Sequence, residues 1–183
     1  MVQILGLSGS LRAGSFNSAL LRAASELMPD GATLAIGTIE GIPLYHGDLE
    51  AERGLPEPVV KLKEQIAGAD GLLLVTPEYN NGIPGVFKNA IDWASRLGSD
   101  IKRVFGGRKA ALMGASPGSF GTLLSQNHWL PVLKALGVDL WAGGQMLLSR
   151  AHEAFDENGK LVDAKNSARL QTFLRGFADY ARS

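Results

Sequence analysis

The feature that most constrains the fold is an apolar run without alternation, Gly71-Leu72-Leu73-Leu74-Val75-Thr76. A strand that is apolar at every position must be covered on both faces, as central strands of parallel sheets are. Other short β-prone runs lie at residues 2–7, 32–39, 109–114 and 138–141, the last with a possible second piece at 145–148. Longer amphipathic stretches separate them. This alternation predicts an α/β domain with a parallel sheet between helices.

The amphipathic stretches give the expected helices, which lie at residues 16–28, 59–67, 84–94, 123–136 and 164–181. Residues 41–58 are rich in Pro, Gly and acids and predict a long irregular connection. With 183 residues and no linker or repeat, the chain predicts one domain over residues 1–183. In such sheets ligands bind beyond the carboxyl ends of the strands, which directs attention to the loops after strands one, three and four.

Composition excludes several functions. Lys+Arg and Asp+Glu are both 18, so the chain lacks the basic footprint of a nucleic-acid binder or a membrane anchor. There is no cysteine, which excludes disulfides and thiolate chemistry, so redox chemistry would need a bound cofactor. The three histidines have no metal-ligand spacing, and no metal site is predicted. With no signal-like N-terminus and no membrane-length apolar run, we expect a cytoplasmic protein.

The loop after the first strand is Ser8-Gly9-Ser10-Leu11-Arg12-Ala13-Gly14-Ser15-Phe16-Asn17. It runs from a buried strand into a helix, and so gathers backbone N–H groups and a helix N-terminus at one spot that suits a phosphate dianion. Ser10, Ser15 and Asn17 add hydrogen-bond donors, and Arg12 adds a positive charge. This loop therefore predicts a phosphate site.

The same loop also restricts the kind of ligand. Gly9 and Gly14 permit close approaches that a Cβ would obstruct. The loop lacks the dinucleotide fingerprint and the lysine of a nucleotide-hydrolysing phosphate loop, so a mononucleotide fits better. The alternative is structural: Ser15 would only cap the helix, and the glycines would only make a turn.

The loop after the third strand contains Pro77-Glu78-Tyr79-Asn80-Asn81 and then Gly82-Ile83-Pro84-Gly85. Prolines and glycines fix its backbone, Tyr79 offers an aromatic face, and Asn80 offers an amide. A flat heteroaromatic ring needs such a surface and such edge groups. After the fourth strand, Ser116-Pro117-Gly118 is a second small-residue loop that would let a ring or phosphate approach the backbone.

Together these motifs resemble the NADPH-dependent FMN reductase family, which includes bacterial chromate/quinone reductases and azoreductases. The resemblance rests on the residues 10–17, on Pro77-Glu78-Tyr79-Asn80, and on Lys88-Asn89-Ala90-Ile91-Asp92-Trp93, and it spans nearly the whole chain. It implies a flavodoxin-like, doubly wound sheet of five parallel strands in the order 2-1-3-4-5, with helices on both faces. It also implies FMN bound by residues 10–17, 78–81 and Ser116, and we include Ser8, Pro77, Pro117 and Gly118 in the candidate site.

The resemblance further implies NADPH or NADH as electron donor and two-electron transfer to a small-molecule acceptor: a quinone, chromate or an azo compound. Bound FMN would carry the chemistry by a ping-pong mechanism, so no catalytic residue is named. A homodimer or homotetramer is implied, and Trp93 and Trp129 lie on helices that could meet another subunit. The family commonly has Gly-Gly and then an arginine after the fourth-strand loop, where this chain has Gly121-Thr122-Leu123-Leu124. That departure affects the expected acceptor preference.

Two alternatives share this fold and these motifs. One is an electron carrier that binds FMN without a nicotinamide site, although the neutral charge of this chain is unlike the acidic flavodoxins. The other is a reductase that supplies free reduced FMN to a monooxygenase. A phospho-receiver needs acids after strand one, and a low-molecular-weight phosphatase needs a cysteine. The chain has neither.

Overall fold

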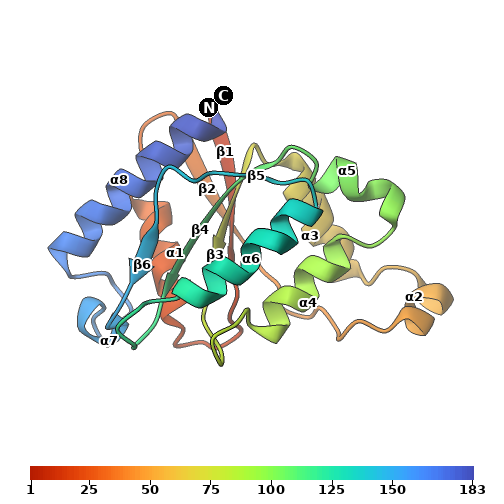
Figure 1. Ribbon diagram of the computed structural model, residues 1–183, viewed down its shortest axis with the longest axis horizontal. Helices are drawn as coiled ribbons and strands as arrows, with labels where there is room; N and C mark the ends of the chain where they lie inside the picture. Colours follow the sequence, from red (N-terminus) through yellow and green to blue (C-terminus); the bar gives the residue numbers. More distant parts are fainter.

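A parallel β-sheet runs through the middle of the molecule, with helices on both faces (Figure 1). The computed structural model describes residues Met1–Ser183. The strands are β1 (Val2–Ser8), β2 (Ala32–Gly37), β3 (Gly71–Val75), β4 (Lys109–Ala115), β5 (Asp139–Leu140) and β6 (Met146–Leu148). Their order is β2-β1-β3-β4-β5, and β6 also pairs with β4. This confirms the predicted order, with the fifth strand divided into two short pieces along the same edge of β4.

The centre of the sheet is buried, as the apolar run at residues 71–76 predicts. Every residue of β3 is buried. It lies between β1 and β4 in parallel register, with Leu72 beside Leu5 on one side and Ala110 on the other. The carboxyl ends of these three strands therefore reach the same edge of the sheet.

One face of the sheet is covered by α1 (Phe16–Glu26) and α8 (Ala164–Ala181). Their apolar stripes pack on the sheet side chains in a single core, with Leu20, Leu174 and Phe177 fully buried. Gly71 permits this packing, because a Cβ there would lie 3.2 Å from the Phe177 ring.

No helix of the molecule combines the length and apolar character needed to cross a membrane.

The opposite face is covered by α3 (Glu57–Gly68), α4 (Gly85–Ala94) and α6 (Leu123–Ala135). Phe87 of α4 and Trp129 of α6 meet edge to face, with ring centroids 5.0 Å apart. Trp93 and Trp129 are almost completely buried and belong to the core of this face, whereas the contact of their helices with another subunit stays a prediction. Pro131 lies inside α6 without ending it. The carbonyl that it leaves without a helical partner belongs to the exposed Asn127, where water can bind.

Four short helical segments were not expected from the sequence. They are α2 (Gly47–Arg53), the 3-10 turn η1 (Gly98–Asp100), α5 (Ile101–Val104) and α7 (Ala151–Ala154). The α2 helix lies within the predicted irregular connection and projects from the side of the domain (Figure 1). The connection that carries α2 is attached to α4 and to the residues that follow α4. Trp93 Nε1 of α4 donates to the Pro43 carbonyl at 2.8 Å, and Arg96, just after α4, pairs with Glu50 of α2 at 2.8 Å.

Candidate functional site

The loops after β1, β3 and β4 meet at one edge of the sheet, opposite the two chain termini (Figure 1). Backbone hydrogen bonds continue the strand pairing into the loops. Gly9 N–H donates to the Val75 carbonyl at 2.9 Å, and Thr76 N–H donates to the Met113 carbonyl at 2.9 Å. The loops selected from the sequence are thus brought together by the sheet.

The β1–α1 loop offers mainly backbone donors. Several of its N–H groups have no hydrogen-bond partner in the chain, namely those of Ser10, Leu11, Ala13, Gly14 and Phe16. Residues 11–14 are exposed, and they lead into the positive end of the α1 dipole. Successive free N–H groups at a helix start form a concave site for an anion. The Arg12 guanidinium lies in the same exposed segment and has no ion-pair partner.

Two predicted phosphate donors of this loop have their side chains turned inward. Ser15 is buried, and its Oγ accepts from the N–H groups of Asn17 and Ser18, so it is the N-cap of α1. Asn17 is also buried. Its Nδ2 donates to the Ala115 carbonyl at 2.8 Å, and its Oδ1 accepts from the Ala115 N–H at 2.9 Å. These two side chains therefore position the loop and fasten it to β4, and their role as direct donors to a phosphate stays a prediction.

Other side chains of the loop also form contacts within the chain. Ser8 Oγ lies 2.9 Å from Ser18 Oγ, and Ser10 Oγ accepts from the Arg12 N–H at 3.2 Å. The Phe16 ring stacks on Phe155 at a centroid distance of 5.9 Å and contributes only its N–H to the edge.

The two glycines of the loop have different roles. A Cβ on Gly9 would lie 2.3 Å from the Phe87 ring and 2.9 Å from Pro77 Cδ, so the close approach predicted for this residue is confirmed. A Cβ on Gly14 would meet nothing closer than 3.9 Å, and its φ is not positive. The structure therefore gives no packing reason for Gly14.

The β3–α4 loop is closed by a tight turn. Tyr79 and Gly82 exchange two backbone hydrogen bonds of 3.1 and 3.0 Å, and the two residues between them have φ values of 50° at Asn80 and 63° at Asn81. Positive φ at both central positions is the type I′ turn, which favours Asn and Gly. The turn leaves Tyr79 half exposed and both asparagines exposed.

Glu78 has a structural contact that the sequence did not indicate. Its Oε2 accepts from the N–H groups of Leu124 at 2.8 Å and Ser125 at 3.0 Å, at the start of α6. A carboxylate there satisfies two unpaired helix donors and complements the helix dipole. The Glu78 N–H has no partner in the chain.

A buried polar cluster behind this loop was missed by the sequence analysis. Thr76 Oγ1 lies 2.8 Å from Ser125 Oγ and accepts from Trp129 Nε1 at 3.1 Å. The cluster ties the end of β3 to α6 and so fixes the start of the Glu78 segment. The available signal was a threonine directly after an apolar strand, where a hydroxyl needs a buried partner.

The β4–α6 loop approaches the same edge. Ser116 Oγ donates to the Gly121 carbonyl at 2.7 Å, and Pro117 and Gly118 are exposed. Gly118 O accepts from the Arg150 N–H at 3.1 Å. Close packing explains Gly114 at the end of β4, because a Cβ there would lie 2.3 Å from the Thr76 carbonyl oxygen.

The donor set matches an anion joined to a flat ring. The β1–α1 loop supplies unpaired N–H groups and a guanidinium for a phosphate. The Tyr79 turn supplies an exposed aromatic side chain and free N–H groups at Glu78 and Asn80 for the edge of a ring. The residues present therefore fit a flavin mononucleotide.

Comparisons with known proteins agree with this geometry. Residues 2–153 match the family described as NADPH-dependent FMN reductase. The chain is 44% identical to the NAD(P)H-dependent FMN reductase PA1204 of Pseudomonas aeruginosa, covering 99% of this chain and 96% of that protein. It is 39% identical to the 2-hydroxy-1,4-benzoquinone reductase of a Burkholderia species, covering 99% and 97%. The structure of FerB, a flavoenzyme NAD(P)H:(acceptor) oxidoreductase from Paracoccus denitrificans, superposes with a TM-score of 0.88 at 32% identity, covering 100% and 98%.

Proposed function

This chain belongs to the NADPH-dependent FMN reductase family and is an FMN-dependent oxidoreductase with a nicotinamide electron donor, and we propose that it transfers two electrons to quinones. The quinone assignment draws on the Burkholderia relative, which is named for a benzoquinone substrate. The family and the cofactor predicted from the sequence are thereby confirmed. The residues that hold FMN, the kinetic mechanism and the range of acceptors are proposals.

The proposed phosphate site is the β1–α1 loop. The observation that carries it is the set of five unpartnered N–H groups before and at the start of α1, those of Ser10, Leu11, Ala13, Gly14 and Phe16, whereas the N–H groups of Arg12 and Ser15 bind within the loop. Arg12 adds the charge that a dianion requires, whereas Ser15 and Asn17 hold the loop in shape from behind. Charge-assisted hydrogen bonds contribute about 1.5–3 kcal/mol each, so a few of them would supply much of a micromolar affinity.

The proposed ring site lies between the Tyr79 turn and the Ser116–Gly118 segment. Tyr79 is exposed enough to lie against a ring, and the turn that carries it is fixed by two backbone hydrogen bonds. The Glu78 carboxylate is held by the start of α6, so the adjacent N–H of Glu78 has a defined position. Asn81, Pro77, Pro117 and Gly118 would shape the rim.

Bound FMN would supply the redox chemistry, taking two electrons from the nicotinamide and giving them to the acceptor. The protein binds the phosphate, orients the ring and leaves one side open for donor and acceptor in turn, which favours a ping-pong mechanism. No side chain at this edge is required as an acid or base. The N–H groups of Glu78 and Asn80 would stabilise negative charge at the ring edge.

The acceptor range follows less directly from the site. Chromate and azo compounds are acceptors that the family resemblance suggests. The stretch Gly121-Thr122-Leu123-Leu124, which stands in place of the family's Gly-Gly and arginine, contains no arginine, and Leu124 is 41% exposed. An apolar residue there favours neutral, flat acceptors over oxyanions, so we propose quinones as the preferred class.

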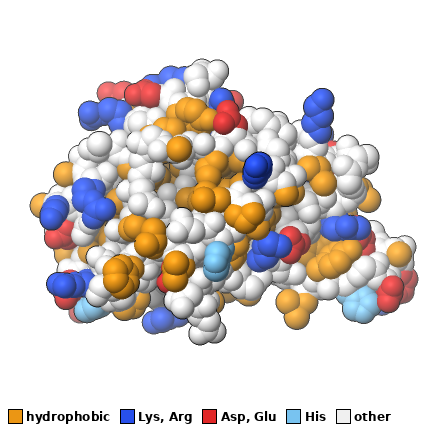
Figure 2. Space-filling model, in the orientation of Figure 1, with side chains coloured by type: hydrophobic (Ala, Val, Ile, Leu, Met, Phe, Trp, Pro, Cys, Tyr) orange, Lys and Arg blue, Asp and Glu red, His pale blue; other side chains and the backbone are white.

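We also propose a homodimer or homotetramer. Support comes from apolar side chains exposed on and near α6 and α4, which are Val86, Phe120, Leu124 and Leu130. Figure 2 shows hydrophobic side chains gathered on the face that carries α6. Burial of these side chains would favour association, and light scattering after gel filtration measures the mass.

The function is tested by anaerobic titration of the purified holoprotein with NADPH or NADH. We expect a yellow protein whose flavin absorbance is lost on reduction and recovers on addition of a benzoquinone. In steady-state turnover with both substrates varied, a ping-pong mechanism predicts parallel double-reciprocal plots. Flavin that stays oxidised with both nucleotides would make the protein a carrier without a nicotinamide site. Flavin that leaves the protein on reduction, followed by gel filtration, would favour the supply of free reduced FMN to a monooxygenase.

A further inference from the structure

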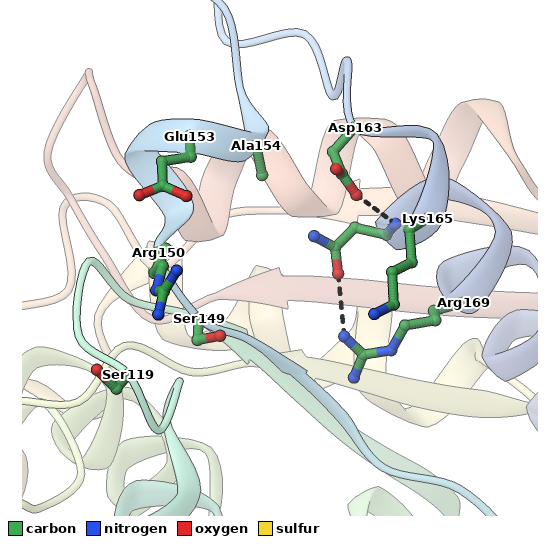
Figure 3. A pocket seen from close by; sticks show the side chains of 9 residues that line it. Ser119, Ser149, Arg150, Glu153, Ala154, Asp163, Lys165 and Arg169 are labelled. Carbon is green, nitrogen blue, oxygen red and sulfur yellow. Dashed lines mark hydrogen bonds between the residues drawn. The ribbon is translucent and has the colours of Figure 1, made fainter.

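A cavity lies beside the β4–α6 loop, between α7 and the start of α8 (Figure 3). Its volume is about 370 Å³, and it is lined almost entirely by polar and charged side chains. Arg150 lies with Ser119 and Ser149 on one side, whereas Lys165 and Arg169 reach in from α8 on the other (Figure 3). The proposed flavin site uses none of these residues.

The three cations of this cavity have no carboxylate partner. No ion pair involves Arg150, Lys165 or Arg169. The Arg169 guanidinium donates only to Asn166 Oδ1 at 3.0 Å and to the Leu147 carbonyl at 3.5 Å. Lys165 and Arg169 stand four residues apart on one helix, where like charges destabilise. An anion bound between them would relieve that repulsion.

Of the two carboxylates in the lining, Asp163 has a structural role, and Glu153 forms no ion pair with the three cations of the cavity. Asp163 is the N-cap of α8, and its Oδ1 accepts from the Asn166 N–H at 2.6 Å. Glu153 lies 3.6 Å from His152 Nε2. Cations outnumber carboxylates three to two in the cavity, and hydroxyls of Ser119 and Ser149 complete a donor set suited to phosphate oxygens.

The cavity is joined to the proposed flavin edge by backbone contacts. Arg150 N–H donates to the Gly118 carbonyl at 3.1 Å, and Ala151 N–H donates to the Ser116 carbonyl at 3.0 Å. Arg150 has a φ of 49°, a left-handed conformation that is uncommon for arginine. Strained residues of this kind concentrate at functional sites. These backbone contacts place Arg150 next to the Ser116–Gly118 segment of the proposed flavin site.

We propose that this cavity binds the 2′-phosphate of NADPH, so that Arg150, Lys165 and Arg169 determine preference for NADPH over NADH. The inference rests on the proposed function, in which a nicotinamide dinucleotide donates electrons at the flavin edge. Its adenosine half must then contact protein beyond that edge, and arginine is the usual partner of a 2′-phosphate. A free phosphate has the same chemistry and is separated from the dinucleotide by experiment.

The test uses the FMN-loaded protein and the variants Arg150→Gln, Lys165→Gln and Arg169→Gln. Calorimetric titration compares adenosine 2′,5′-bisphosphate with 5′-AMP, which lacks the 2′-phosphate. We expect the wild type to bind the bisphosphate about tenfold or more tightly, and each variant to lose most of that difference. The KM for NADPH should rise about tenfold with the KM for NADH unchanged. Arg175→Gln, an exposed cation farther along α8, is the matched control and should change neither.

Equal affinity of the wild type for the two adenosine nucleotides would overturn the proposal. So would variants that bind inorganic phosphate less tightly but keep their preference for NADPH, because the cavity would then serve a free anion. If the protein oxidises neither NADPH nor NADH, the proposed function fails. Bisphosphate binding that is lost in the variants would still establish the cavity as a phosphate site.

Discussion

The loops after β1 and β3 both lead from a buried strand into a helix, yet they present opposite parts of the chain. In the β1–α1 loop the side chains of Ser15 and Asn17 point inward and the backbone N–H groups are free. In the β3–α4 loop the Tyr79–Gly82 turn closes the backbone on itself and the side chains of Tyr79 and Asn80 are exposed. The first loop offers mainly backbone donors beside the Arg12 guanidinium, and the second offers exposed side chains beside the free N–H groups of Glu78 and Asn80.

The difference matches the two ends of a flavin mononucleotide. A phosphate dianion is bound well by several N–H groups that point to one spot, and these groups need a loop held from behind by buried side chains. A flat ring needs an exposed aromatic face on a rigid turn. Four variants test this difference between the two loops, and we give them in order of decreasing expected effect.

Asn17→Ala should have the largest effect, on folding itself. It leaves the buried N–H and C=O of Ala115 without partners, each at a cost of about 1–3 kcal/mol, so we expect a loss of about 2–5 kcal/mol in the free energy of unfolding. Urea denaturation of the flavin-free protein measures it without the contribution of bound cofactor. The matched variant Asn80→Ala lies in the exposed turn and should cost about 1 kcal/mol. Equal losses would contradict the division between the two loops.

Gly14→Glu should act on binding and leave stability intact. A Cβ at residue 14 would meet no close neighbour, so the side chain fits, but its carboxylate would stand among the N–H groups assigned to phosphate. We expect the dissociation constant for FMN to rise about 10–100-fold, with Gly14→Gln as the uncharged control close to wild type. Fluorescence quenching of free FMN measures this constant. Similar constants for the two variants would remove the phosphate from this loop.

Tyr79→Ala should weaken FMN binding about 2–10-fold, the amount expected for loss of one aromatic contact. Because Tyr79 is half exposed, the free energy of unfolding should change by no more than about 0.5 kcal/mol. Tyr79→Phe keeps the ring and should bind FMN normally. If the alanine variant binds and turns over like wild type, Tyr79 is only a loop residue.

Asn81→Gly should have the smallest effect. Glycine adopts the φ of 63° without strain and is the preferred second residue of a type I′ turn, although it increases the entropy of the unfolded chain. We expect a change of about 0.5 kcal/mol or less in unfolding free energy, and a dissociation constant for FMN within about threefold of wild type, because Asn81 lies only at the rim of the proposed ring site. A marked loss of FMN affinity would instead show that the Asn81 side chain contacts the ring.

The fold and the meeting of the three loops at one edge of the sheet were predictable because they depend on local patterns. The unbroken apolar run at Gly71–Val75 identified the central strand, and the edge rule then placed the three loops together. The α2 helix was missed for the opposite reason. None of its residues is buried, so Gly47–Arg53 has no apolar stripe for the sequence to reveal.

The roles of individual side chains were less predictable, because they depend on partners far away in the chain. The sequence predicted Asn17 as a phosphate donor, whereas in the structure its side chain binds the backbone of Ala115, 98 residues later. Glu78 likewise binds N–H groups 46 and 47 residues later. The sequence alone does not distinguish a polar loop residue that faces a ligand from one that binds a buried backbone group.

The central claim is that the β1–α1 loop binds the phosphate of FMN. The most direct test is to titrate the flavin-free protein with FMN and with riboflavin, which has the same ring and no phosphate. The free N–H groups and Arg12 predict that FMN binds at least about 100-fold more tightly. Equal dissociation constants for the two flavins would contradict the claim.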